Sequence, residues 1–70
     1  MKVLKITSIG FDSWDREVFE TEDGLLLCDV NLDRTHKNMR LHTKVGNDFG
    51  GEPCWPVPCE VEIIDDRALR

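Results

Sequence analysis

The sequence predicts a mainly β fold, a small twisted antiparallel sheet or open barrel of about four to five strands. Short runs of alternating apolar and polar residues recur along the chain, an Asp-Gly pair separates two of them, and all three prolines fall in one stretch near the C-terminal end. Alternation is typical of half-buried strands, and closely spaced prolines disfavour a helix. An α+β alternative with a short helix over Ser13–Phe19 stays open, because the apolar residues there also have roughly helical spacing.

The length and the charge of the chain limit its architecture and its partners. Residues 1–70 form a single small domain, and a chain this short buries only about 60% of the surface that its unfolded form exposes. The net charge of −5 argues against general nucleic-acid binding, and no apolar run approaches the length of a membrane span. Lys2 and Lys5 interrupt the apolar N-terminal residues too early for a signal peptide, so we expect a cytoplasmic protein without membrane contact. Residues 66–70 are expected to form a frayed tail.

The first half of the chain predicts a strand followed by a hairpin. Lys2–Ile9 alternates and ends at a glycine, which gives the first strand. The Asp23-Gly24 pair predicts a tight turn, because both residues tolerate positive φ, and the hairpin spans Arg16–Val30. Its second arm, Leu25–Val30, is apolar on both faces for most of its length, which is typical of a central strand.

The second half predicts a polar loop, two strands and a long connector between them. Residues 31–38 are rich in turn formers, and Met39–Lys44 then alternates. In this strand we expect inward side chains at Met39, Leu41 and Thr43, and outward side chains at Arg40, His42 and Lys44. The connector, 45–58, combines permissive glycines with stiff prolines and is expected to be a long, ordered loop. Cys59–Asp65 alternates again and gives the last strand.

The first and last strands are predicted to be neighbours in the sheet. The two strands carry matching apolar and oppositely charged side chains, namely Leu4 and Ile6 with Val61 and Ile63, and Lys2 and Lys5 with Glu60 and Glu62. Each cross-strand pair contributes only about 0.2–1 kcal/mol, so these pairs select the partner strand rather than supply the stability.

The tryptophans suggest where a partner binds. In one interpretation Trp14 and Trp55 both fill the small core, because large aromatic residues dominate such cores. In the other, Trp55 is partly exposed among prolines and forms a rigid apolar patch that loses little entropy on binding. On the second interpretation the predicted partner-binding residues are Phe49, Glu52, Pro53, Trp55, Pro56 and Arg40.

The cysteines and histidines allow a metal alternative. Cys54, Cys59 and His42 supply ligand types that zinc prefers, but one loose pair of cysteines is not the usual pattern of two tight pairs. We favour Cys28 as a small core residue, with the other two thiols packed at the ends of the connector rather than bridged. His36 and His42 have neither a nucleophile nor a carboxylate at motif spacing, so no catalytic residue, enzyme activity or cofactor is predicted.

Charge is unevenly distributed along the chain. Acidic residues dominate 12–33 and basic residues dominate 34–44. The function we predict is a non-enzymatic protein-interaction module that presents a sheet edge and the connector, and an uncovered edge also allows a homodimer. A zinc-binding module is one alternative, and an acidic inhibitor that mimics nucleic acid through the 12–33 hairpin is another.

Two stretches resemble the pattern of small uncharacterised bacterial domains, including some carried in large polyvalent proteins of phages and conjugative elements. The first stretch is Asp12-Ser-Trp-Asp-Arg-Glu-Val-Phe with Glu22-Asp-Gly and Asp29-Val-Asn-Leu; the second is Leu41-His-Thr-Lys with Asn47-Asp-Phe-Gly-Gly-Glu-Pro53. The resemblance covers most of the chain from Asp12 to Pro53 and does not reach Cys54–Cys59. It implies a bacterial or mobile-element origin and a compact β-rich unit, and it brings no activity with it.

Overall fold

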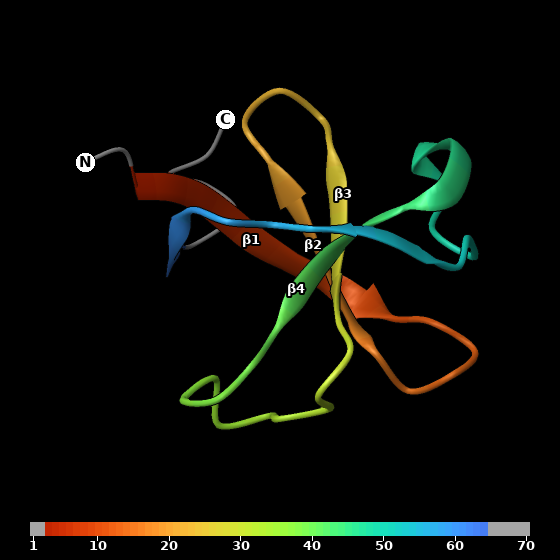
Figure 1. The fold of residues 1–70 in the computed structure, drawn as a ribbon, viewed down its shortest axis with the longest axis horizontal. Helices are drawn as coiled ribbons and strands as arrows, with labels where there is room; N and C mark the ends of the chain where they lie inside the picture. Colours follow the sequence, from red (N-terminus) through yellow and green to blue (C-terminus); the bar gives the residue numbers. More distant parts are fainter. Residues whose placement is uncertain (1–2, 65–70) are drawn as a thin grey trace.

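The chain forms one open, twisted β-sheet, which a computed structural model describes for residues 3–64. Its elements are β1 (Val3–Phe11), β2 (Glu17–Thr21), β3 (Leu26–Asp29), β4 (Leu41–Lys44), the short 3-10 turn η1 (Val45–Asn47), β5 (Pro53–Pro56) and β6 (Glu60–Ile63). The strand order is β5-β4-β3-β2-β1-β6 (Figure 1). The predicted mainly β fold is confirmed. The described part of the chain has six strands rather than four to five, because the connector contributes β5.

The predicted hairpin is confirmed as β2 and β3. The two strands are antiparallel, and Gly24 has the positive φ of 85° that the turn requires, with its N–H donating to Thr21 O at 3.0 Å. The helix alternative over Ser13–Phe19 is wrong. Asp12 Oδ1 accepts hydrogen bonds from the N–H groups of Trp14 and Arg16, which closes a tight turn and returns the chain into β2.

The centre of the sheet is buried on both faces, as predicted for the second arm of the hairpin. In β3, Leu27, Cys28 and Asp29 are all buried. β4 lies beside β3 and deviates from its predicted alternation, because Lys44 is 4% exposed instead of facing solvent. The connector that follows β4 covers the Lys44 side chain, whose ammonium group donates to the Phe49 carbonyl, so β4 is buried at its two ends and partly buried between them.

The first and last strands are neighbours with the predicted side-chain partners. Leu4 pairs with Val61, and Lys5 pairs with Glu62. The two strands run parallel, whereas the sequence predicted a sheet that is antiparallel throughout. Parallel pairing follows from the route of the chain, which crosses the sheet between β5 and β6 to reach the start of β1 (Figure 1). Predictions for Lys2, Asp65 and the tail 66–70 lie outside the described residues.

The hydrophobic core lies between one face of the sheet and this crossing segment. Its buried side chains are Ile6, Phe19, Leu27 and Leu41. Val57 and Val61 pack against them from the crossing segment and β6, and Val57 N–H donates to Leu41 O at 2.9 Å. Within residues 3–64 there is no helix with the length and apolar character needed to cross a membrane.

Candidate functional site

Trp55 stands exposed on β5, the edge strand that forms inside the proline-rich connector. Its side chain is 73% exposed, and that of Trp14 is 66% exposed, so the interpretation that both tryptophans fill the core is wrong. Within residues 3–64, β5 pairs with β4 along one side only, and the Trp55 N–H donates to Thr43 Oγ1 at 3.0 Å. A neighbouring strand therefore fixes the backbone beneath Trp55 while the indole ring remains in solvent.

Hydrogen bonds hold the part of the connector that precedes β5. Val45 N–H donates to Glu52 O at 2.9 Å, and Gly51 N–H donates to Asp48 O at 2.8 Å. Asn47 adds a long-range tie to the β2–β3 hairpin, because its side chain accepts from Leu26 N–H at 2.7 Å and donates to the backbone carbonyl of Gly24. The connector is thus ordered, as predicted, and its shape is set by contacts to strands far away in the sequence.

A buried ion pair lies beneath the connector. Lys44 Nζ lies 2.8 Å from Asp12 Oδ2, and both side chains are fully shielded from solvent. The same ammonium group donates to the backbone carbonyl of Phe49, and the Phe49 ring lies over Gly10, where a Cβ atom would come within 3.5 Å of it. Lys44 therefore joins the β1–β2 turn to the connector that carries β5.

The electrostatics of this cluster favour an ionised aspartate. Burial by itself would raise the pKa of Asp12, but hydrogen bonds from Lys44 and Arg16, together with backbone N–H groups, outweigh it and hold the pKa well below its ordinary range. Arg16 Nε lies 2.9 Å from Asp12 Oδ2, and its guanidinium stacks 5.9 Å from the centre of the Trp14 ring. Two cations share one carboxylate here, and the buried Arg16 Nη2 has no hydrogen-bond partner among residues 3–64.

Sequence reasoning missed this cluster. Lys44 closes an alternating segment, so its place in the pattern predicts an outward side chain. The signal that points to burial is the glycine-containing segment directly after it, because Gly46, Gly50 and Gly51 let the chain fold back over the strand.

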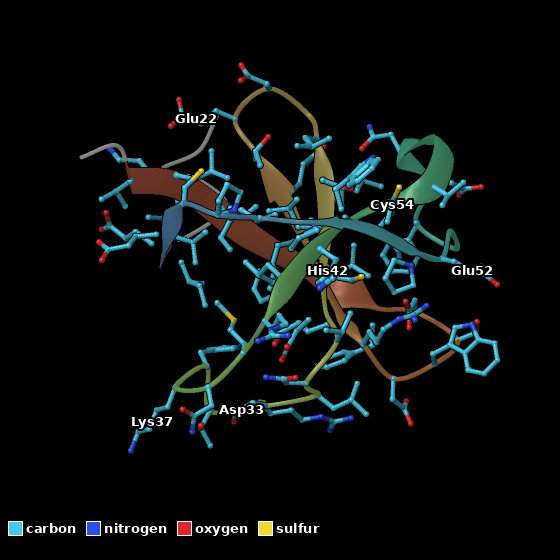
Figure 2. The ribbon with its side chains drawn as sticks, in the orientation of Figure 1. Glu22, Asp33, Lys37, His42, Glu52 and Cys54 are labelled. Atoms are coloured by element: carbon cyan, nitrogen blue, oxygen red, sulfur yellow. The ribbon has the colours of Figure 1, made fainter. Side chains whose placement is uncertain are left out.

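The structure brings together only part of the predicted partner-binding set. Pro53, Trp55 and Pro56 lie on β5, and Glu52 directly precedes that strand. Figure 2 shows Glu52 and Cys54 on this side of the molecule, away from Asp33 and Lys37 in the loop before β4. Phe49 is 37% exposed, and its ring packs over Gly10 and Lys44.

Arg40 lies by a pocket at the other end of β4. This pocket has a volume of about 210 Å³ and is lined by Met39, Arg40, Leu41, Val57, Cys59 and Val61. The backbone N–H of Arg40 donates to Asp29 Oδ1 at 2.9 Å, which fixes its position. Arg40 therefore lines this pocket, whereas Trp55 does not.

The three cysteines differ in their exposure to solvent. Cys28 is buried, as predicted, whereas Cys54 and Cys59 are exposed free thiols that do not pack at the ends of the connector. Among the residues that the structure describes, no three His, Cys, Asp or Glu side chains form a group suited to a metal ion, and Cys54, Cys59 and His42 are not gathered together.

Much of the acidic hairpin is used inside the fold. Asp12 and Asp29 are buried, and Asp29 accepts backbone hydrogen bonds from Asn31, Asp33 and Arg40. Glu17 accepts from Ser8 Oγ and lies 2.7 Å from His36 Nε2. Carboxylates that already have internal partners are poorly placed to imitate a row of phosphates.

Comparison with protein-family models, with curated proteins and with solved structures finds no match. The resemblance to small bacterial domains therefore stays a prediction.

Proposed function

We propose that the chain is a non-enzymatic protein-interaction module that binds a protein partner through the outer surface of β5. The observation that carries this proposal is Trp55, 73% exposed on a strand whose backbone is fixed by β4. Tryptophan is enriched among the residues that contribute most to protein–protein binding, and the side chain offers about 150–250 Å² of surface to bury.

Rigidity of the surface supports this role. Pro53 and Pro56 flank the tryptophan within β5, and proline fixes φ near −65°. The buried Lys44 holds the connector from below through the Phe49 carbonyl. A surface already in its binding conformation loses little conformational entropy on association, so more of the contact energy remains as affinity.

We infer that β5 binds through side chains rather than by adding a partner strand. Pro53 and Pro56 have no N–H, and the Trp55 N–H is directed to Thr43. At most the Cys54 N–H remains for a partner strand, and edge prolines are a common protection against strand pairing. An apolar pocket or groove on the partner that accepts the indole ring fits this surface.

Two matched variants test the proposal. Trp55→Ala and Trp14→Ala each remove one exposed tryptophan, the first from β5 and the second from the turn between β1 and β2. Tagged wild type and both variants are used for affinity capture from an extract of the organism that produces the protein, with quantitative mass spectrometry. A partner that binds through β5 is recovered by wild type and Trp14→Ala and lost from Trp55→Ala by about tenfold or more, equivalent to about 1.4 kcal/mol. Equal recovery of every captured protein by all three baits refutes the proposal.

A further inference from the structure

β6 forms the second edge of the sheet, and its chemistry is the opposite of that of β5. Within residues 3–64, β1 is the neighbour of β6 and its other side has no partner strand. Ile64 N–H donates to Ile6 O at 2.8 Å, toward β1. Because successive N–H groups along a strand point to opposite sides, those of Val61 and Ile63 point away from β1. No proline lies in β6, so this edge keeps the donors and acceptors that a further strand needs.

The side chains of β6 alternate between apolar and acidic. Val61 packs against the core, whereas Glu60 and Glu62 are exposed on the other face. The salt bridges found in the described part of the chain involve other carboxylates, although Lys5 of β1 lies beside Glu62. The edge therefore combines a free backbone side with exposed acidic side chains.

The existing neighbour of β6 shows which side chains suit it. β1 places Leu4 beside Val61, Lys5 beside Glu62 and Ile6 beside Ile63. A strand on the free side meets the same alternation, because side chains opposite one another in a sheet share a face. Lysine or arginine then lies beside the glutamates, and an apolar side chain lies beside Val61.

The pocket beside Val61 favours an apolar side chain at that position. Met39, Leu41 and Val57 contribute apolar lining, so the pocket lies between the start of β4, the segment that precedes β6, and β6 itself. Its volume of about 210 Å³ suits one aliphatic side chain rather than a larger ligand. Arg40 also lines the pocket and disfavours a cation there, so the pattern that fits is basic-apolar-basic rather than uniformly basic.

We propose that the free edge of β6 binds an extended segment of a protein partner in which apolar residues alternate with lysine or arginine, and adds it to the sheet as a further strand. A second copy of this chain fits poorly through β6 itself, since Glu60 and Glu62 of the two copies would face each other. This proposal concerns the edge opposite to β5, so it does not depend on the role of Trp55.

A charge-swap experiment tests the side-chain part of the proposal. The probe is the labelled peptide Thr-Val-Lys-Val-Lys-Val-Thr, with capped ends, measured by fluorescence anisotropy against the full chain. We expect saturable binding that weakens with salt and falls about tenfold or more for Glu60→Lys/Glu62→Lys. The same variant is expected to bind the peptide in which glutamate replaces both lysines, which wild type binds weakly. Glu22→Lys/Asp23→Lys makes the same change in net charge in the exposed β2–β3 turn; it serves as the control and is expected to retain wild-type affinity.

A second pair of variants tests the backbone part. Ile63→Pro removes an N–H that points away from β1, whereas Ile63→Ala removes the same side chain and keeps that N–H. We expect loss of peptide binding for Ile63→Pro and retention for Ile63→Ala, with circular dichroism and thermal melting to verify that both are folded. Equal binding by the two variants, no binding by wild type up to about 1 mM peptide, or a dimer of wild type that competes with the peptide for β6 overturns the proposal.

Discussion

Lys44 Nζ lies 2.8 Å from Asp12 Oδ2 in a site where both side chains are completely buried. The two residues are far apart in the sequence, and their contact links the turn after β1 to the connector that forms β5. The proposed binding through β5 depends on this link, because it holds the base of the surface that carries Trp55. Four predictions follow from the fold and the cluster, and each can be measured without knowledge of the partner.

Removal of the lysine is predicted to destabilise the fold strongly. Lys44→Met leaves the Asp12 carboxylate buried with one cation fewer, and breaking a buried ion pair in this way costs about 3–5 kcal/mol. Chemical denaturation measures the free energy of unfolding. Lys37→Met removes an exposed lysine and is expected to change it by less than about 0.5 kcal/mol. Similar values for the two variants would contradict a structural role for the buried pair.

Acid is predicted to weaken the fold through Asp12. Because the folded-state pKa of Asp12 is lowered, its contribution to stability is complete above the ordinary aspartate pKa of about 3.9 and is lost progressively as the pH falls below it. Asp12→Asn is expected to be less stable at neutral pH and to show a shallower decrease in unfolding free energy below about pH 4. Asp23→Asn, which removes one charge from the exposed β2–β3 turn, is the control. Parallel acid profiles for wild type and Asp12→Asn would rule out this linkage.

Two adjacent glycines are predicted to respond differently to the same substitution. A Cβ atom on Gly51 would lie 2.5 Å from the Val45 carbonyl oxygen and 3.1 Å from that of Asp48, whereas one on Gly50 would meet nothing within 4 Å. Gly51→Ala is therefore expected to destabilise the chain by about 1–3 kcal/mol, and Gly50→Ala to leave its stability within about 0.5 kcal/mol. Thermal melting monitors both, and an inverted order would show that the connector takes a different path.

The three thiols are predicted to react in two classes. Cys54 and Cys59 are exposed, whereas Cys28 is buried and burial raises the pKa of its thiol. The thiolate is the reactive form, so iodoacetamide is expected to modify Cys54 and Cys59 in the folded protein and Cys28 only after unfolding. Peptide mass spectrometry over a time course measures this order. Rapid labelling of Cys28 under native conditions would contradict its place in β3.

Side-chain alternation predicted much of the sheet but not the direction of every strand. The partners Leu4–Val61 and Lys5–Glu62 follow from matching apolar and charged positions. The same matches are available to parallel and antiparallel strands, so the pattern does not encode the direction. The direction is fixed by the crossing segment, whose route depends on tertiary contacts such as that of Val57 with Leu41.

The burial of Lys44 and the formation of β5 could not be predicted from the side-chain pattern either. An alternating pattern shows on which side of a strand a residue lies, but not what later covers that side. The prolines correctly predicted the absence of a helix in 53–58, yet they are compatible with an edge strand because their missing N–H groups need no partner there. Of the predicted site, Glu52, Pro53, Trp55 and Pro56 follow one another in or directly before β5, whereas Phe49 packs over Gly10 and Arg40 lines a pocket.

Site-specific photo-crosslinking tests the central claim most directly. A benzophenone amino acid is placed at position 54, next to Trp55 in β5, in one variant and at position 14 in another, and both are irradiated in an extract of the organism that produces the protein. The proposed role of β5 predicts a discrete crosslinked protein from position 54 that is absent from position 14, although both side chains are exposed. No adduct from position 54, or the same adducts from both positions, would contradict it.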